Sequence, residues 1–239
     1  MKGALITLAC ALPALALAAA GCYCVYVEYG VAQMLAYLLL CALFFPLASL
    51  LHELGHIICG KLCGMRVKLV KNGVFRPSGC SVLPERPGNM RARLVFTALG
   101  GLIVNFVFAV VGMGLLFADG VALYFSFFAP ASFYLFMINV LPVTYSGGDT
   151  DMLLALQAIK NTDVWKVLGR VLEIQGMITA GTPIEGIEED LFFSVPQIAE
   201  YEPAFIMLVS LRADYYAARG DEENAKKWGD RLESINSDI

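Results

Sequence analysis

The sequence predicts an all-α polytopic membrane protein. We expect about four transmembrane helices, a small β-hairpin or sheet between the second and third, and a C-terminal helical cytoplasmic domain. The 239 residues are 58% hydrophobic and only 16% charged, whereas a soluble domain has about 25% charged residues. Four apolar runs are each long enough to cross a bilayer, which takes about 20 residues. Most acidic residues follow the fourth run.

The first apolar run, about residues 4–27, has two interpretations. It is long enough for a membrane span. It also has the parts of a signal peptide: a charged start at Lys2, an apolar middle, and small residues before Cys22. We favour a retained span. Residues 1–30 are therefore predicted to form a first transmembrane segment or a signal-like segment, with the same topology downstream in both cases.

The second run, about residues 30–60, carries His52-Glu53-Leu54-Gly55-His56, which contains the only two histidines of the chain. Four residues apart on a helix, both rings lie on one face and can reach one metal ion. Imidazole suits zinc, and Glu53 is placed to take a proton from a water on that metal. Two structural histidines are the alternative, but ionisable groups in a membrane-length segment are costly and usually functional.

The third ligand has to come from another residue type. A catalytic zinc usually has three protein ligands and one open position. Because there is no third histidine, we expect a carboxylate or a cysteine. Asp149 is the first choice, since the helical pattern ends at Pro142 and Gly147-Gly148, where the chain can turn the Asp149 side chain back toward the metal. Asp151 is the second choice. The alternative role for Asp149 is to cap the helix that follows.

The seven cysteines lie at positions 10, 22, 24, 41, 59, 63 and 80. Their number is odd and most lie in or beside apolar runs, so we interpret them as small hydrophobic residues rather than a disulfide framework. Cys59 and Cys63 follow the histidines closely. A zinc site closed by them would be structural, however, and would leave Glu53 without a role.

The connection between runs two and three is basic. Residues 61–93 contain eight Lys or Arg and one acidic residue. Because basic loops stay on the cytoplasmic side, this connection orients the chain. We expect a multi-pass protein of the cell membrane with both termini in the cytoplasm. The histidine motif and Asp149 then lie at the cytoplasmic ends of their spans, so the active site faces that side.

The same connection contains a hairpin signal. The segments 67–70 and 74–76 flank Asn72-Gly73, which favours a tight β-turn. Residues 80–83 could add a third strand. A plain cytoplasmic loop is the alternative. A small sheet with an open edge could pair with an extended peptide.

The third and fourth runs cover about residues 94–118 and 121–141. Gly100-Gly101 allow close helix packing in a bilayer. Asn105 is a polar group within the third run, and we expect it to form an interhelical hydrogen bond. The fourth run ends at Asn139-Val140-Leu141-Pro142.

The tail, residues 161–239, is predicted to be helical. Residues 203–218 and 222–235 form two helices joined at Gly220-Asp221, with Asp221 as N-cap of the second. They are similar to one tetratricopeptide-like hairpin. We favour an ordinary helical cap, and a module that binds a protein partner is the alternative. From residue 151 onward there are sixteen acidic and eight basic residues, so we expect no nucleic-acid binding.

These motifs together resemble the site-2 protease family of intramembrane zinc metalloproteases. That family pairs H-E-x-x-H with a later N-x-x-P…D-G segment. The chain has His52-Glu53-Leu54-Gly55-His56, then Asn139-Val140-Leu141-Pro142, then Asp149. Gly100-Gly101-Leu102-Ile103-Val104-Asn105 is similar to a further G-P-x-x-N stretch but lacks the proline. Thr150 stands where the family has glycine, and no PDZ or CBS domain is visible.

The resemblance covers about residues 30–160 and implies a transmembrane catalytic core over 31–160. It implies that His52, His56 and Asp149 hold one Zn²⁺ ion and that Glu53 acts as the general base. Asn139 would donate to the oxyanion or to the substrate backbone. The implied activity is that of a zinc metalloendopeptidase. It would act in the lipid bilayer on a membrane-spanning or membrane-anchored peptide, such as a regulator, a signal peptide or a precursor peptide.

Two other classes of function remain open. The chain could be a non-proteolytic membrane scaffold or binding protein with a vestigial or structural zinc site, which the Thr150 departure and the acidic tail motivate. A transporter is disfavoured because few intramembrane charges lie outside the motif and no internal repeat is visible.

Overall fold

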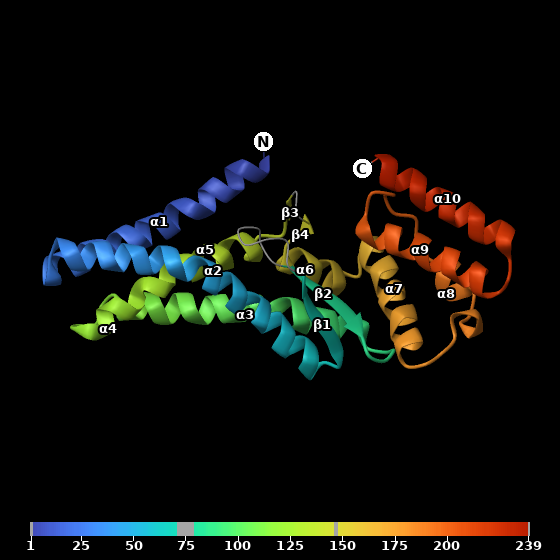
Figure 1. Cartoon of the computed structure of the whole chain (residues 1–239), viewed down its shortest axis with the longest axis horizontal. Coiled ribbons are helices and arrows are strands. Elements are labelled where there is room, and N and C mark those ends of the chain that lie inside the picture. The colour runs from blue at the N-terminus through green and yellow to red at the C-terminus, as the bar shows by residue number, and fades with distance from the viewer. Residues whose placement is uncertain (1, 71–78, 146–147, 239) are drawn as a thin grey trace. The chain divides into compact units, whose positions relative to one another are not determined.

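The computed structural model describes residues 2–70, 79–145 and 148–238, which are mostly helical (Figure 1). The longer helices are α1 (Lys2–Tyr29), α2 (Val31–Leu62), α3 (Met90–Leu115), α5 (Ala129–Val140), α6 (Asp151–Lys160), α7 (Asp163–Thr179), α9 (Pro203–Ala218) and α10 (Glu222–Asp238). The short helical turns are α4 (Val121–Tyr124), η1 (Phe125–Phe128), η2 (Ile184–Gly186) and α8 (Asp190–Phe193). The strands are β1 (Met65–Val70), β2 (Gly79–Pro84), β3 (Thr144–Tyr145) and β4 (Gly148–Asp149).

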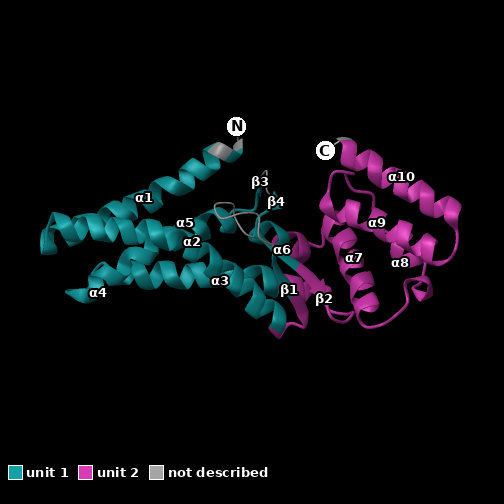
Figure 2. Ribbon diagram, in the orientation of Figure 1, with its two compact units in different colours: residues 1–61, 67–81, 96–155 teal, residues 62–66, 82–95, 156–239 magenta. Residues whose placement is uncertain are grey.

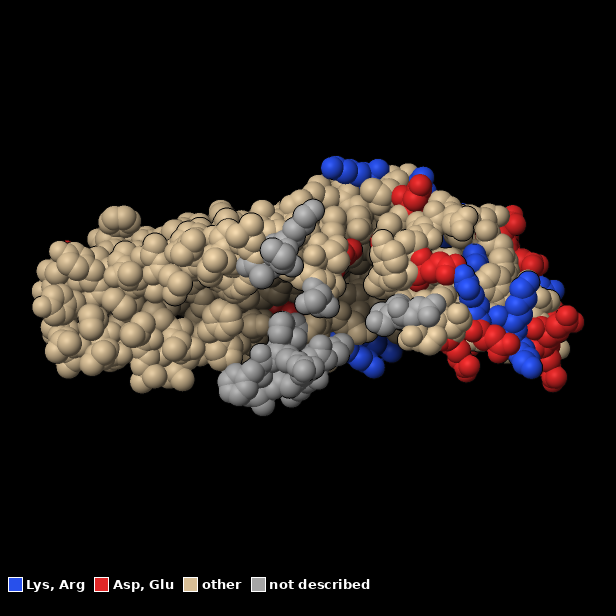
Figure 3. Space-filling view, turned by 90° about the horizontal axis from the view of Figure 1, so that it is seen from above, with Lys and Arg blue, Asp and Glu red and all other residues tan. Residues whose placement is uncertain are grey.

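Four helical segments of the described chain are long and apolar enough to cross a membrane. They are Leu5–Tyr29, Val31–Leu62, Met90–Leu115 and Val121–Val140, with mean hydropathies of 2.1, 2.3, 2.4 and 1.8. Figure 3 shows a face of these helices with almost no charged side chains, whereas charged residues gather on the C-terminal helices. A soluble monomer rarely exposes an apolar patch larger than about 300–600 Å². The helices are therefore compatible with a multi-pass membrane protein, as the sequence predicts.

The basic connection contains a small sheet, as predicted. β1 and β2 pair with each other in a two-stranded sheet. The segment 80–83, expected as a third strand, lies within β2 and pairs directly with β1. The predicted turn at Asn72-Gly73 and the strand at 74–76 lie outside the described residues.

The described chain divides into two compact units, coloured separately in Figure 2. Unit 1 comprises residues 1–61, 67–81 and 96–155, and contains most of the long apolar helices. Its interior includes Tyr37, which is fully buried and shares a hydrogen bond of 2.9 Å with Ser126. A second cluster forms where Phe44 packs edge-on against Phe127. The four apolar segments thus bury part of their surface against one another.

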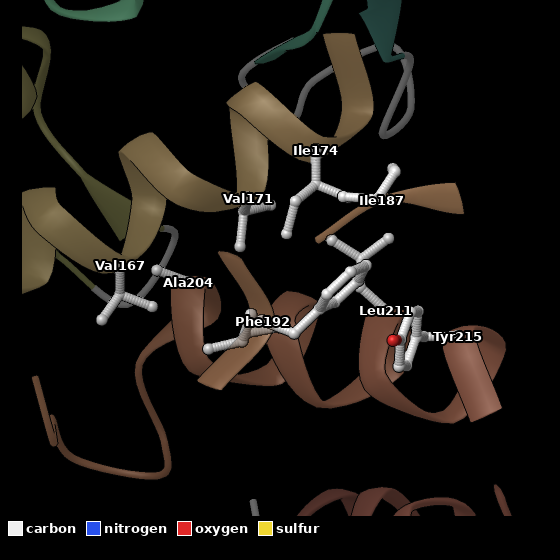
Figure 4. Close-up of a cluster of buried hydrophobic side chains, with 9 residues drawn as sticks. Val167, Val171, Ile174, Ile187, Phe192, Ala204, Leu211 and Tyr215 are labelled. Carbon is white, nitrogen blue, oxygen red and sulfur yellow. The ribbon is translucent and has the colours of Figure 1, made fainter. Parts of the chain in front are cut away.

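Unit 2 comprises residues 62–66, 82–95 and 156–239 and has its own hydrophobic core. Figure 4 shows side chains from α7, α8 and α9 meeting in that core. The residues labelled there are Val167, Val171, Ile174, Ile187, Phe192, Ala204, Leu211 and Tyr215. The apolar stripe of α7 follows the 3.6-residue period of an amphipathic helix, which explains why one face of α7 is buried.

The two C-terminal helices α9 and α10 lie close to the predicted ranges and pack against each other. The left-handed backbone of Gly220, with φ 73°, ends the first helix and glycine adopts it without strain. The carboxylate of Asp221 then accepts a hydrogen bond from the backbone N–H of Asn224 at 3.1 Å. Asp221 therefore caps α10, as the sequence predicts.

Candidate metal centre

Helices α2 and α3 approach closely beside the histidine motif. A side-chain carbon added at Gly55 would lie 2.4 Å from the carbonyl oxygen of Gly100. One added at Gly101 would lie 2.6 Å from His56 Nε2 and from the His52 ring. Glycine is the only residue that fits at these contacts. The close approach brings polar groups of α3 within reach of both histidines.

The two histidine side chains point at each other across one helical turn. His52 Nε2 and His56 Nε2 are 3.1 Å apart, and both residues are buried. The i, i+4 spacing on α2 produces this convergence, as the sequence predicts.

The other nitrogen of each ring is held by α3. His56 Nδ1 is 2.8 Å from the carbonyl oxygen of Thr97. Because a carbonyl only accepts, His56 Nδ1 must carry the proton, which leaves the Nε2 lone pair of the neutral ring free for a metal. The side-chain NH₂ of the almost fully buried Asn105 lies 2.9 Å from His52 Nδ1 and donates to it. A metal on His52 Nε2 requires the other orientation of the amide, in which the Asn105 oxygen accepts from Nδ1–H. Asn105 therefore forms the expected interhelical hydrogen bond, and it orients a motif residue.

Asp151, in the first turn of α6, completes the group. Its Oδ2 lies 3.0 Å from His52 Nε2 and its Oδ1 lies 3.4 Å from His56 Nε2. Burial by itself raises the pKa of Asp151, but in the metal-free centre hydrogen bonds and charge from the histidines in their protonated form outweigh burial and lower this pKa to about 2. The carboxylate is therefore ionised at neutral pH, as a metal ligand must be.

The structure thus differs from the first choice for the third ligand. Asp149 lies on β4, and its carboxylate accepts a hydrogen bond from the Thr144 hydroxyl at 2.7 Å. It does not join the histidine group, and Asp151, the second choice, does. Asp149 also does not cap α6, because the hydroxyl of Thr150 accepts from Leu153 N–H at 3.4 Å and has that role.

The geometry of the three residues fits a metal ion. The two histidine nitrogens are 3.1 Å apart, and different oxygens of Asp151 lie 3.0 Å from His52 and 3.4 Å from His56, so that one atom from each residue lies within 4.8 Å of the others. Two atoms that bind a tetrahedral zinc at about 2.0–2.1 Å lie roughly 3.3–3.4 Å apart. Among the described residues, this is the one group of three or more His, Cys, Asp or Glu side chains close enough to share an ion. Cys59 and Cys63 are not part of it.

Two further predicted residues can be placed. Glu53 is buried beside His52 and lies outside the ligand group. Its Oε2 is 2.8 Å from the Cys80 thiol, a contact that the sequence does not indicate. The side-chain amide of Asn139 donates to the carbonyl of Leu135, one turn earlier on α5, at 3.0 Å. That hydrogen bond stays within the helix and does not reach the histidines.

The chain matches no family model, no curated protein and no solved structure. Two imidazoles and one carboxylate fill three positions of a tetrahedral metal, and no fourth His, Cys, Asp or Glu of the described residues joins them.

Proposed function

We propose that the chain is an intramembrane zinc metalloendopeptidase of the site-2 protease type. One observation carries the proposal: three side chains able to hold one metal ion converge beside a buried glutamate, near the end of a membrane-length helix. In this proposal His52, His56 and Asp151 hold one zinc ion. Asp151 takes the place that the sequence resemblance gives to Asp149.

The chemistry of each residue type suggests its role in the proposed reaction. Zinc bound there would supply a nucleophile at neutral pH by lowering the pKa of a bound water toward 7. Glu53 accepts the proton of the attacking water and passes it to the leaving amine. Thr97 and Asn105 keep the two imidazole rings turned toward the ion. Asn139 remains a proposed donor to the substrate backbone.

The proposed substrate is a membrane-spanning or membrane-anchored peptide. A peptide bond inside a helix is shielded, so the substrate must be extended before hydrolysis. The two-stranded sheet of β1 and β2 offers an edge to which an extended peptide could add. The basic residues of 61–93 favour the cytoplasmic side of the membrane for the site and for both termini, because basic loops tend to stay on that side.

The test uses the full-length protein in detergent, zinc analysis, and a set of single-span reporter peptides with helix-breaking residues. We expect about one zinc per chain and cleavage of at least one reporter. Glu53→Gln should retain zinc and lose about 10²–10⁴-fold in rate, the contribution of a general base. Glu85→Gln, an exposed acid on the same connection, serves as the control.

Two results would contradict the proposal. Cleavage by Glu53→Gln at the wild-type rate would exclude the mechanism. Zinc binding by the wild type without cleavage of any reporter would favour the non-proteolytic scaffold with a structural or vestigial site.

A further inference from the structure

The thiol of Cys80 makes a direct contact with the proposed general base. Cys80 lies on β2, and its Sγ is 2.8 Å from Glu53 Oε2 and 3.9 Å from the Glu53 backbone oxygen. An ionised carboxylate only accepts hydrogen bonds, so the thiol hydrogen is the one that bridges the two atoms. β2 follows α2 by more than fifteen residues, so this contact is tertiary and not a consequence of local helix geometry.

The environment keeps Cys80 a donor. Burial raises the pKa of the Cys80 thiol, and the hydrogen bond and negative charge of Glu53 raise it further. The thiol therefore stays protonated at neutral pH. Its sulfur is not part of the ligand group of His52, His56 and Asp151. Cys80 thus faces the base and not the metal position.

We propose that Cys80 is a positioning residue that holds Oε2 of Glu53 and leaves Oε1 to accept the proton in catalysis. This inference rests on the proposed function, because Glu53 is a base only if the site is hydrolytic. The physical reason is the flexibility of glutamate, whose side chain has several rotatable bonds. A hydrogen bond to one carboxylate oxygen selects the rotamers in which the other oxygen keeps a fixed direction. Oε1 of Glu53 then accepts the proton of the attacking water from one fixed direction.

The first experiment compares Cys80→Ala with Cys80→Ser in the full-length, zinc-loaded protein. Cys80→Ala removes the donor, and we expect kcat to fall about 10- to 100-fold, the range for a lost hydrogen bond to a charged group. KM and zinc content should stay at wild-type values. Cys80→Ser restores an O–H donor and should recover most of kcat. Cys63→Ala is the matched control, since Cys63 is another half-buried thiol.

Three outcomes of that experiment would overturn the proposal. Wild-type kcat in Cys80→Ala would show that the contact has no catalytic effect. An equal loss in Cys80→Ala and Cys80→Ser would show that the volume of the side chain matters and the donor does not. Loss of zinc in Cys80→Ala would assign Cys80 to the integrity of the site rather than to Glu53.

The second experiment does not depend on activity, so it separates this proposal from the proposed function. Alkylation of each cysteine by iodoacetamide is followed by mass spectrometry in wild type, Glu53→Gln and Glu85→Gln. Because the charge of Glu53 disfavours the Cys80 thiolate, Glu53→Gln should speed the alkylation of Cys80 several-fold and leave Cys63 unchanged. Glu85→Gln should match wild type. Equal Cys80 rates in wild type and Glu53→Gln would overturn the contact itself, whether or not any reporter peptide is cleaved.

Discussion

The hydroxyl of Thr150 donates a hydrogen bond to the backbone carbonyl of Leu141 at 2.7 Å, which ties the start of α6 to the end of α5. The same oxygen accepts from Val143 N–H at 3.3 Å and from Leu153 N–H at 3.4 Å. Thr150 is buried, so these bonds have little competition from water. One side chain therefore closes the connection and caps the helix, and the next residue is the proposed ligand Asp151.

Replacing Thr150 tests whether this connection places the ligand. Thr150→Val keeps the shape of the side chain but removes the hydroxyl, so the closure and the helix cap are both lost. We expect zinc affinity to fall about tenfold, in the range for residues that support a ligand. Thr150→Ser keeps the hydroxyl and should stay near wild type. Competition with a chromogenic chelator measures the affinity, and equal affinity in Thr150→Val and wild type would contradict the prediction.

The two aspartates can be distinguished by their effect on metal binding. Asp151→Asn removes the charge of the proposed ligand and should lower zinc affinity by more than the roughly 10- to 100-fold typical of supporting residues. Asp149→Asn should bind zinc like wild type, because its carboxylate contacts Thr144 and not the histidines. Both variants keep the side-chain volume. The opposite ranking in zinc content after dialysis would restore Asp149 as the ligand.

The parts of the site that follow a local period were predictable from the sequence. His52 and His56 are one helical turn apart, so their convergence needs only α2 to be a helix. The N-cap at Asp221 and the glycine contacts of α2 with α3 are likewise properties of short motifs. In each case the residues that interact are close in sequence or are small residues in apolar helices.

The third ligand was harder to predict from the sequence, because its position depends on the conformation of the loop between α5 and α6. The resemblance to a known motif favoured Asp149, whereas the residue that lies beside the two histidines in the structure is Asp151, two positions later. The signal for Asp151 was Thr150, a good N-cap residue that places the following acid in the first turn of α6. The contact of Cys80 with Glu53 had no such signal, since it joins residues of a strand and a helix that are 27 positions apart.

The glycine of α3 that faces the histidines can be tested against a glycine of the same helix that faces open space. Gly101→Ala places a carbon 2.6 Å from His56 Nε2, so the ring must move and we expect zinc binding to be lost. Nothing lies within 4 Å of a carbon added at Gly114, so Gly114→Ala should bind zinc normally. Alanine is also the better helix former by about 1 kcal/mol. Zinc binding by Gly101→Ala at the wild-type level would contradict the close approach of α2 and α3.

The last prediction concerns Arg212, which is buried in unit 2. Its Nε donates to the carbonyl of Phe192 at 2.9 Å, and its guanidinium lies 4.8 Å from the Phe193 ring and 4.6 Å from the Trp228 ring. Arg212→Ala removes two cation–π contacts of about 0.5–2 kcal/mol each and leaves a buried carbonyl without this donor. We expect the C-terminal helices to lose about 2–4 kcal/mol of stability, as measured by urea unfolding of the full chain with Trp228 fluorescence in a Trp165→Phe background.

Arg231→Ala, which breaks an exposed ion pair with Glu200, should cost at most about 1 kcal/mol. Equal unfolding midpoints for the two variants would show that the stacking of Arg212 does not stabilise α9 and α10.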